Sequence, residues 1–259
     1  MKNLIRLIHM SFLTELCAKT HPFLTAATNL LFPPRCVACG VEVDAAHSFC
    51  NDCFARLRLI ASPLCVHCGV PFAYAMGDGA VCASCLQDPP PFTEARAAMH
   101  YDDASRKLIT RLKYADKQEL IPALAAQLWR IGAPLCAKAD WIIPVPLHPK
   151  RLRSRKFNQS ALLAYALADY AGLPVMADGL VRTENTPPQA SLPRKERIKN
   201  VRRAFRANHK RAALLRGARL LLVDDVVTTG ATINACSKAL LGAGAKAVYV
   251  LTVAKTVKE

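Results

Sequence analysis

Residues 220–232 constrain the fold of this chain more than any other segment, and they read Leu-Leu-Leu-Val-Asp-Asp-Val-Val-Thr-Thr-Gly-Ala-Thr. The short apolar run at 220–223, followed by two acids, is typical of a central strand in a parallel sheet. Gly230 can adopt a positive φ in the turn that follows. Apolar residues at helical spacing predict a helix that begins near Ala231, and the apolar run at 247–253 predicts the next strand. The segment therefore predicts a βαβ unit of an α/β fold.

The loop of this unit has the chemistry of a phosphate site. Backbone N–H groups at a helix N-terminus attract anions, and the hydroxyls of Thr228, Thr229 and Thr232 meet at the same place. Asp224 and Asp225 stand where carboxylates can accept hydrogen bonds from vicinal hydroxyls. We therefore predict a ribose 5-phosphate site, formed by Asp224, Asp225, Val226, Val227, Thr228, Thr229, Gly230, Ala231 and Thr232.

The alternative is an ordinary strand–helix corner, with solvent-exposed aspartates and threonines that only cap the helix. The contiguous order of apolar strand, paired acids and Thr/Gly loop favours the ligand site. No Walker lysine follows Gly230, which disfavours hydrolysis of a nucleoside triphosphate.

The first third of the chain carries four Cys-x-x-Cys pairs: Cys36/Cys39, Cys50/Cys53, Cys65/Cys68 and Cys82/Cys85. Two such pairs bring four thiolates to one Zn²⁺, so the spacing predicts two structural Cys₄ zinc ribbons. Disulfides are the alternative, and the lack of a convincing secretory signal disfavours them. The spacing leaves open whether neighbouring pairs share a metal or the pairs interleave. The other cysteines, Cys17, Cys136 and Cys236, are predicted to be small buried residues.

The composition changes at residues 89–91, where three prolines separate a Cys-rich region from an Ala/Leu-rich one. We predict three parts: an amphipathic N-terminal helix region at 1–33, a double zinc ribbon at 34–88 and an α/β domain at 94–254. Charges interrupt the apolar residues of the N-terminal region too often for a membrane span, and no other run reaches spanning length. A cytoplasmic zinc protein is the simplest interpretation.

A second predicted strand, at 141–145, precedes a basic loop. Strands and helices alternate before it, with a strand at 95–101 and helices at 105–114 and 119–131. Ligands of open α/β sheets bind beyond the carboxyl ends of the strands, so this loop and the acidic loop should face one crevice. A diphosphate is the predicted occupant, held by backbone amides of the turn and by added positive charge, at Val145, Pro146, Leu147, His148, Lys150 and Arg151. The alternative is that these cations are solvated loop residues.

Residues 183–205 have no helical or alternating apolar pattern in their first half. Long loops of this kind in compact domains are usually functional. We predict a lid over a phosphorylated substrate, with Arg194 and Arg197 among its cations. The alternative is a nucleic-acid surface.

Taken together, these segments resemble the ComF family of competence-associated and GntX-like proteins. The resemblance covers nearly the whole chain and rests on the motifs at 32–40, 144–152, 155–159, 185–189, 197–201 and 223–232. It implies a type I phosphoribosyltransferase-like fold, a parallel sheet flanked by helices and preceded by a small Cys-rich double zinc-ribbon module. It also implies 5-phosphoribosyl-1-pyrophosphate (PRPP) as the ligand, with Mg²⁺, in a cytoplasmic bacterial protein that acts in natural transformation or the use of imported DNA.

The resemblance further implies roles for the site residues if the chain is an enzyme. Asp224 and Asp225 would be the catalytic pair that orients the ribose, residues 228–232 would hold the 5-phosphate, and the 145–151 loop with Mg²⁺ would hold the departing pyrophosphate. Purine-salvage relatives place an aspartate at the start of the loop as general base, where this chain has Thr228. Purine salvage is therefore disfavoured and the acceptor stays unidentified. The alternative is a competence adaptor without turnover, which senses PRPP or binds DNA.

The chain carries a net charge of +16, with cations concentrated at 150–156 and 194–219. Such an excess indicates a polyanionic partner beyond one small substrate. Single-stranded or duplex DNA is the second predicted ligand, and other competence proteins, such as a DNA helicase or translocase, are candidate partners.

Overall fold

A computed structural model describes residues 32–113, 118–184 and 204–257. The chain forms two compact units, Met1–Cys53 and Phe54–Glu259. Nearly all of the predicted N-terminal helix region lies outside the described residues. Helix α2 (Asn51–Ala55) begins at the end of the first unit.

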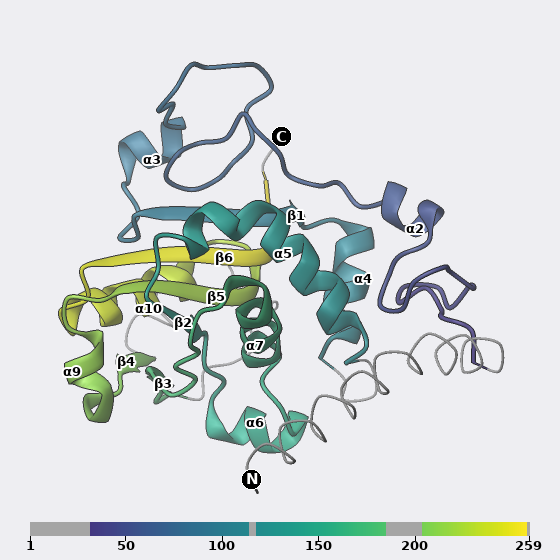
Figure 1. The fold of residues 1–259 in the computed structure, drawn as a ribbon. Helices are drawn as coiled ribbons and strands as arrows, with labels where there is room; N and C mark the ends of the chain where they lie inside the picture. Colours follow the sequence, from purple (N-terminus) through teal and green to yellow (C-terminus); the bar gives the residue numbers. More distant parts are fainter. Residues whose placement is uncertain (1–31, 114–117, 185–203, 258–259) are drawn as a thin grey trace, which may run out of the picture. The chain divides into compact units, whose positions relative to one another are not determined.

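A parallel sheet of four strands is the centre of the second unit (Figure 1). Its strand order is β1 (Glu94–His100), β6 (Ala247–Lys255), β5 (Arg219–Val227) and β2 (Trp141–Pro144). Strands β5 and β6 are buried along almost their whole length, as expected of parallel strands that are covered on both faces. The predicted parallel sheet is therefore confirmed.

Helices cover both faces of this sheet (Figure 1). Helices α5 (Leu120–Cys136) and α7 (Gln159–Ala171) pack together against one face, and α10 (Ala231–Gly242) covers the other. Alternation along the strands explains this division, because Val248 and Val250 of β6 belong to the core cluster with α10, whereas Leu251 lies against Gly132 of α5. The remaining helices of the described residues are α3 (Ala83–Gln87), α4 (Asp103–Arg111), α6 (Pro149–Arg155), α9 (Ala212–Leu215) and the 3₁₀ helix η3 (His209–Arg211). No helix among the described residues combines the length and the apolar content needed to cross a membrane.

A small antiparallel pair, β3 (Leu180–Arg182) and β4 (Phe205–Ala207), stands apart from the main sheet. Residues 185–203, between these strands, are outside the described part of the chain. Phe205 joins the core cluster of α10, so the pair is anchored to the helix that follows the acidic loop.

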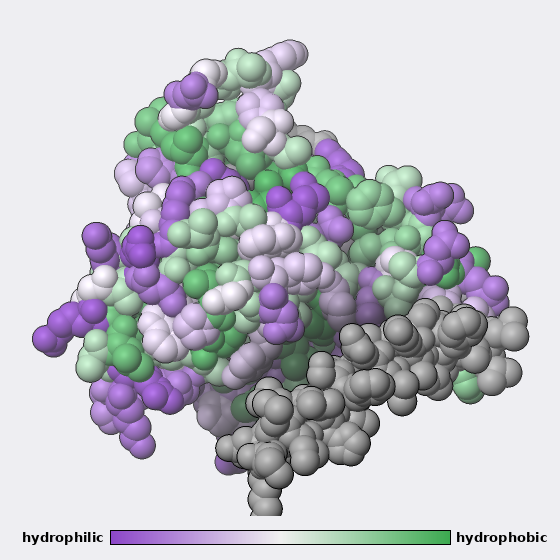
Figure 2. All heavy atoms as spheres, in the orientation of Figure 1, coloured by the Kyte–Doolittle hydropathy of each residue, from purple (hydrophilic) through white to green (hydrophobic). Residues whose placement is uncertain are grey.

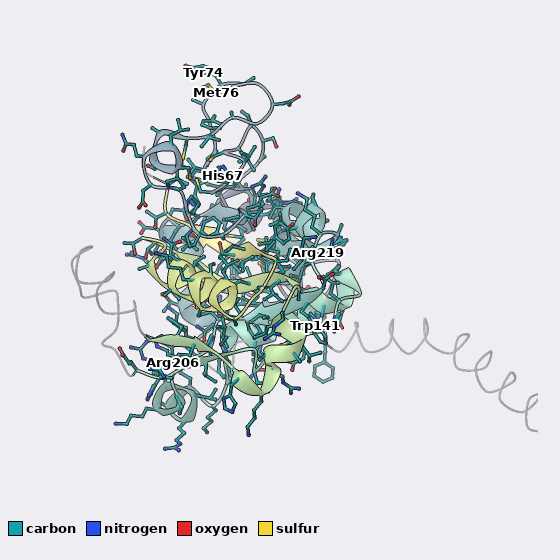
Figure 3. All side chains as sticks on the ribbon, turned by 90° about the vertical axis from the view of Figure 1, so that its left-hand side faces the viewer. His67, Tyr74, Met76, Trp141, Arg206 and Arg219 are labelled. Carbon is teal, nitrogen blue, oxygen red and sulfur yellow. The ribbon has the colours of Figure 1, made fainter. Side chains whose placement is uncertain are left out.

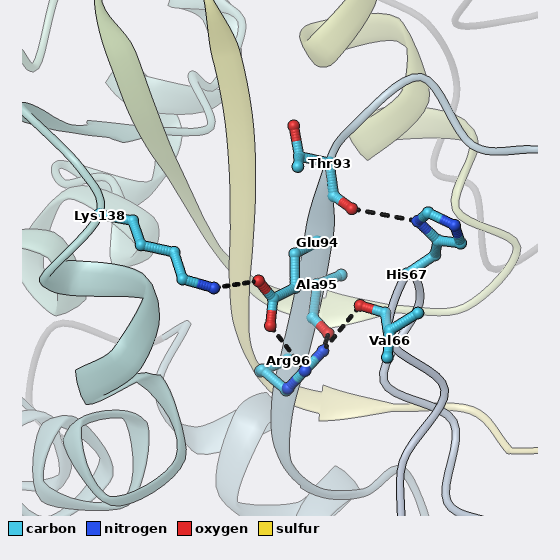
Figure 4. A network of polar contacts seen from close by, with 7 residues as sticks. All are labelled: Val66, His67, Thr93, Glu94, Ala95, Arg96 and Lys138. Carbon is cyan, nitrogen blue, oxygen red and sulfur yellow. Dashed lines mark hydrogen bonds and ion pairs between the residues drawn. The ribbon is translucent and has the colours of Figure 1, made fainter. Parts of the chain in front are cut away.

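The second Cys-rich ribbon belongs to the same compact unit as the sheet and is attached to its edge strand (Figure 4). The N–H of Ala95 in β1 donates to the carbonyl of His67 at 2.6 Å, and Arg96 donates to the carbonyl of Val66 at 3.3 Å. Glu94 accepts from Arg96 and from Lys138, which follows α5. The edge of β1 is thus covered, which removes a site for unwanted strand pairing.

Two element bounds differ from the sequence prediction, and the first of them concerns the acid pair. Strand β5 continues to Val227, four residues beyond the predicted apolar run, so both acids lie within the strand. Helix α5 continues to Cys136 through Pro134, because a proline there removes only one backbone donor from the last turn.

Candidate functional site

The acid pair lies buried near the carboxyl end of β5, with Asp224 7% and Asp225 6% exposed. The start of α7 holds both carboxylates. Ser160 Oγ donates to Asp224 Oδ1 at 2.9 Å, and Gln159 Nε2 donates to Asp225 Oδ2 at 3.3 Å. The Asp225 N–H also donates to Asp224 Oδ1, at 2.9 Å. The alternative of solvent-exposed strand-end acids is therefore excluded, while their role toward a ribose stays a prediction.

The electrostatics of this pair are unfavourable in the protein alone. Burial raises the pKa of Asp224 well above its ordinary value, and the neighbouring charge of Asp225 raises it further. The hydroxyl of Ser160 and the N–H of Asp225 oppose the shift by donating to the charged form. Two adjacent buried carboxylates are a feature of functional sites, because burial of like charges is costly without a role to maintain it.

The loop between β5 and α10 has the predicted backbone geometry. Gly230 adopts φ +77°, and α10 begins at the next residue, Ala231. Thr229 Oγ1 accepts from the Ala231 N–H at 3.4 Å, while Thr228 is exposed and Thr232 half-buried. The loop thus places hydroxyls beside the N-terminus of a 12-residue helix, where an anion is favoured.

The basic loop after β2 offers fewer amides than the sequence suggested. The N–H of Val145 donates to the Val223 carbonyl at 2.9 Å, and Pro146 has no N–H. Only the N–H groups of Leu147 and His148 therefore remain as candidate donors in the predicted turn, and binding of a diphosphate there stays a prediction. His148 Nδ1 accepts from the N–H of Lys150 at 3.3 Å and so caps α6.

The two loops are joined through α7. Asn158 accepts from the Ser160 N–H at 3.1 Å as the helix cap, and its Nδ2 donates to the Val145 carbonyl at 3.0 Å. Sequence reasoning did not assign a role to Asn158, Gln159 or Ser160. The signal that points to them is a cap residue followed by two polar residues at the start of an otherwise apolar helix.

Among the predicted cations, Lys150 is exposed and Arg151 is half-buried. Burial, and then the charge of Arg155, lowers the pKa of Arg151. The predicted lid residues Arg194 and Arg197 lie outside the described residues.

The eight paired cysteines form two clusters, Cys36/Cys39/Cys50/Cys53 and Cys65/Cys68/Cys82/Cys85. Within each cluster all four Sγ atoms lie within 4.8 Å of one another. Tetrahedral Zn–S bonds of about 2.3 Å place ligand sulfurs about 3.8 Å apart. The distances of 3.7 Å between the sulfurs of Cys39 and Cys50, and 3.6 Å between those of Cys68 and Cys82, fit that geometry. The clusters therefore fit two structural zinc ions, and consecutive pairs share a site.

Backbone N–H groups favour the thiolate form of one cysteine in each cluster. Burial raises the pKa of Cys36, but N–H groups led by that of Cys50 outweigh this effect and lower the pKa to about 6. Cys65 has the same balance, with N–H groups of Cys68 and Cys82, and its pKa is also about 6. A site with four protein thiolates has no open position for water, so these centres are structural. Cys136 and Cys236 are buried as predicted, and Cys17 lies outside the described residues.

Two family models match the chain: a double zinc ribbon domain over residues 27–86 and a phosphoribosyl transferase domain over residues 158–258. DNA utilization protein YhgH of Salmonella typhi is 32% identical over 236 residues, which span 88% of this chain and 99% of that protein. Competence protein F of Haemophilus influenzae is 31% identical over 230 residues, with 85% and 96% covered. Competence protein ComFC of Bacillus subtilis is 27% identical over 202 residues, with 75% and 78% covered.

Among solved structures, glutamine PRPP amidotransferase from B. subtilis, complexed with ADP and GMP, is 23% identical. The match covers 55% of this chain and 30% of that chain, with a TM-score of 0.34. Because that likeness is partial, the assignment rests on the family models, the full-length relatives and the two Cys₄ clusters. The chain belongs to the ComF family, in which a double zinc ribbon precedes a phosphoribosyltransferase domain.

Proposed function

We propose that this protein binds PRPP with Mg²⁺ at the carboxyl ends of β2 and β5, in the cytoplasm, as part of DNA uptake or the use of imported DNA. The observation that carries the proposal is the buried acid pair of Asp224 and Asp225 beside the N-terminus of α10. A diol-binding pair next to an anion-binding helix end suits a ribose 5-phosphate. The two Cys₄ clusters that fit zinc are typical of proteins from a reducing compartment, where cysteines do not form disulfides.

Magnesium would enter with the ligand. Mg²⁺ prefers oxygen ligands and usually combines one or two carboxylates with substrate phosphates and waters. The oxygens of Asp224 and Asp225 suit this chemistry, although Ser160 and Gln159 already donate to them. When bound, the ion would neutralise part of the negative charge of the diphosphate.

The reaction that suits the domain is transfer of the phosphoribosyl group, in which the bond from C1 to the diphosphate breaks and an acceptor bonds to C1. The protein would contribute positioning and charge stabilisation: Asp224 and Asp225 orient the ribose, the 228–232 loop holds the 5-phosphate, and the 147–151 segment holds the diphosphate. Thr228 is exposed at the start of the loop and supplies no carboxylate base. The acceptor would therefore have to react without a carboxylate base from this position. A PRPP sensor without turnover would use the same site.

Calorimetric titration of the zinc-loaded chain with PRPP and Mg²⁺ tests the proposal. Asp225→Asn keeps the size of the side chain and should weaken binding about tenfold or more, because hydrogen bonds to a charged group are lost. Asp169→Asn, at an exposed acid of α7, is the matched control and should bind as the unaltered chain does. No binding by the unaltered chain, or full affinity in Asp225→Asn, would refute the site.

DNA is a second candidate ligand, supported by the net charge of +16 and by exposed cations of α6, β4 and η3. Figure 2 shows hydrophilic side chains gathered around α9. Fluorescence anisotropy of a labelled single-stranded oligonucleotide should give a binding constant that falls steeply with salt. Arg206→Gln with Lys210→Gln should weaken this binding, whereas Asp225→Asn should not. Interaction with a DNA helicase or translocase would follow from the same role.

A further inference from the structure

Lys255, the last residue of β6, contacts the second zinc centre directly. Its ammonium donates to the carbonyl of Cys68 at 2.9 Å. Cys68 belongs to the cluster Cys65/Cys68/Cys82/Cys85. Lys255 is half-buried, so this hydrogen bond is partly shielded from water and is stronger than the same bond in bulk solvent.

The second ribbon lies against the sheet through its metal-binding knuckle and not through its outer loop (Figure 3). The carbonyl of His67, in the knuckle, accepts from the N–H of Ala95 in β1 at 2.6 Å. Tyr74 and Met76, in the outer loop, are 80% and 61% exposed and lie at the far end of the ribbon (Figure 3). A change in the geometry of the knuckle therefore acts on the sheet directly.

The backbone of Lys255 belongs to the sheet at the place where the 228–232 loop begins. Lys255 pairs with Val227, the last residue of β5. The N–H of Thr256 donates to the Val227 carbonyl at 2.9 Å. The Lys255 carbonyl accepts from the N–H of Tyr101, just beyond β1, at 2.8 Å. Thr228 follows Val227 in the chain, so one side-chain hydrogen bond and one pair of strand residues connect the second zinc centre to the loop.

This connection holds a part of the fold that would otherwise open easily. The ends of strands open at a lower free-energy cost than their centres, because fewer contacts hold them. The bond from Lys255 to Cys68 fixes the end of β6, and the strand pairing fixes the end of β5 beside it. A loop that is already held in its binding geometry loses less conformational entropy when an anion binds.

We infer that Lys255 is a positioning residue that couples the second zinc centre to the loop proposed for the 5-phosphate. This inference rests on the proposed function. Coupling between two binding sites is reciprocal, so zinc at the second centre should strengthen PRPP binding, and PRPP should strengthen zinc binding there by the same factor. The first centre lies in the other compact unit and should not respond.

The first measurement is calorimetric titration of the full zinc-loaded chain with PRPP and Mg²⁺. Lys255→Met removes the donor but keeps an unbranched side chain, and it should weaken PRPP binding about five- to tenfold, the low end for coupled sites. Lys255→Arg retains a charged donor and should bind within about twofold of the unaltered chain. Lys246→Met, just before the opposite end of β6, is the matched control and should leave the dissociation constant unchanged.

The second measurement is the zinc affinity of each centre, from competition with a zinc-selective chelator, with and without PRPP and Mg²⁺. PRPP should raise the affinity of the second centre about five- to tenfold and leave that of the first unchanged. The first centre thus serves as an internal control for direct binding of zinc by PRPP. Cys39→Ser removes a ligand of the first centre and identifies its zinc. In Lys255→Met the response of the second centre should disappear.

The outcomes separate this inference from the proposed function. If the unaltered chain binds no PRPP, both fail. If it binds PRPP but Lys255→Met keeps full affinity, or both zinc centres respond to PRPP alike, only the role of Lys255 is overturned. A lower melting temperature of Lys255→Met, with both affinities unchanged, would show a role in stability alone and would also overturn it. If Lys255→Met does not fold, the unaltered chain decides, because a second centre that does not respond to PRPP refutes the inference.

Discussion

The two Cys₄ centres share their local structure but differ in what they are attached to. In each, a backbone N–H donates to the first cysteine sulfur, from Cys50 to Cys36 at 3.2 Å and from Cys82 to Cys65 at 3.3 Å. A glycine with positive φ follows the first knuckle in both, Gly40 at +82° and Gly69 at +67°. The same local sequence pattern therefore produces the same knuckle geometry in both centres.

The two centres belong to different compact units: the first lies in Met1–Cys53, and the second, the cluster of Cys65, Cys68, Cys82 and Cys85, lies in the unit that contains the sheet. The Lys255 ammonium, at the end of β6, donates to the Cys68 carbonyl at 2.9 Å. A Cβ atom on Gly69 would meet the carbonyl oxygen of Ala95 in β1, whereas one on Gly40 would meet no other described atom within 4 Å. The first zinc ribbon therefore belongs to a compact unit of its own, while the second covers the edge strand of the parallel sheet.

The largest difference should appear when each metal is lost in turn. Cys68→Ser should destabilise the sheet by about 4 kcal/mol or more, because a structural zinc contributes directly to folding and this ribbon covers β1. Cys39→Ser should leave the main unfolding transition in place and release only the first zinc. Calorimetric scans of both variants, with zinc content measured, check this contrast; equal losses in the main transition would contradict it.

A smaller contrast is expected from the two glycines. Gly40→Ala should cost about 1 kcal/mol, the strain of a positive φ alone. Gly69→Ala should cost about 2–4 kcal/mol, because the added carbon also meets the backbone of β1. Chemical denaturation measures both free energies of unfolding. Equal costs would mean that the second knuckle does not rest on the edge strand.

Lys255→Met tests one hydrogen bond that links the second ribbon to β6. Loss of the donor to the Cys68 carbonyl should cost about 1–2 kcal/mol. Lys246→Met, at the exposed residue just before the same strand, is the control and should change the free energy of unfolding by less than about 0.5 kcal/mol. Thermal unfolding of the two variants measures both effects. Similar melting temperatures would show that the hydrogen bond from Lys255 does not stabilise the protein.

The acid pair should respond in the opposite direction from the ribbons, with the smallest effect. Asp224→Asn should raise the melting temperature by about 2–4 °C, because it removes a buried charge while keeping an oxygen acceptor for Ser160. The folded pKa of Asp224 lies above its unfolded value, so its cost is present at neutral pH and disappears as pH falls through the folded pKa. The gain should therefore vanish in acid, which melting curves across pH can check; a gain that persists there would contradict the raised pKa.

Local patterns predicted the parts of this structure that local chemistry determines. The helix start at Ala231 and the turn at Gly230 follow from residues within one segment, and cysteine spacing indicated the two metal centres. The burial of Asp224 could not be predicted in this way, because its partner Ser160 lies 64 residues away. Attachment of Gly69 to β1 likewise depends on a contact between segments that are distant in the sequence.

Amide hydrogen exchange of the full zinc-loaded chain, with and without PRPP and Mg²⁺, tests the central claim most directly, since it reports both binding and its place. The account predicts slower exchange in residues 226–232 and 147–151, and unchanged exchange in the first ribbon. Protection confined to other segments, or no protection at saturating PRPP, would contradict a PRPP site at the carboxyl end of this sheet.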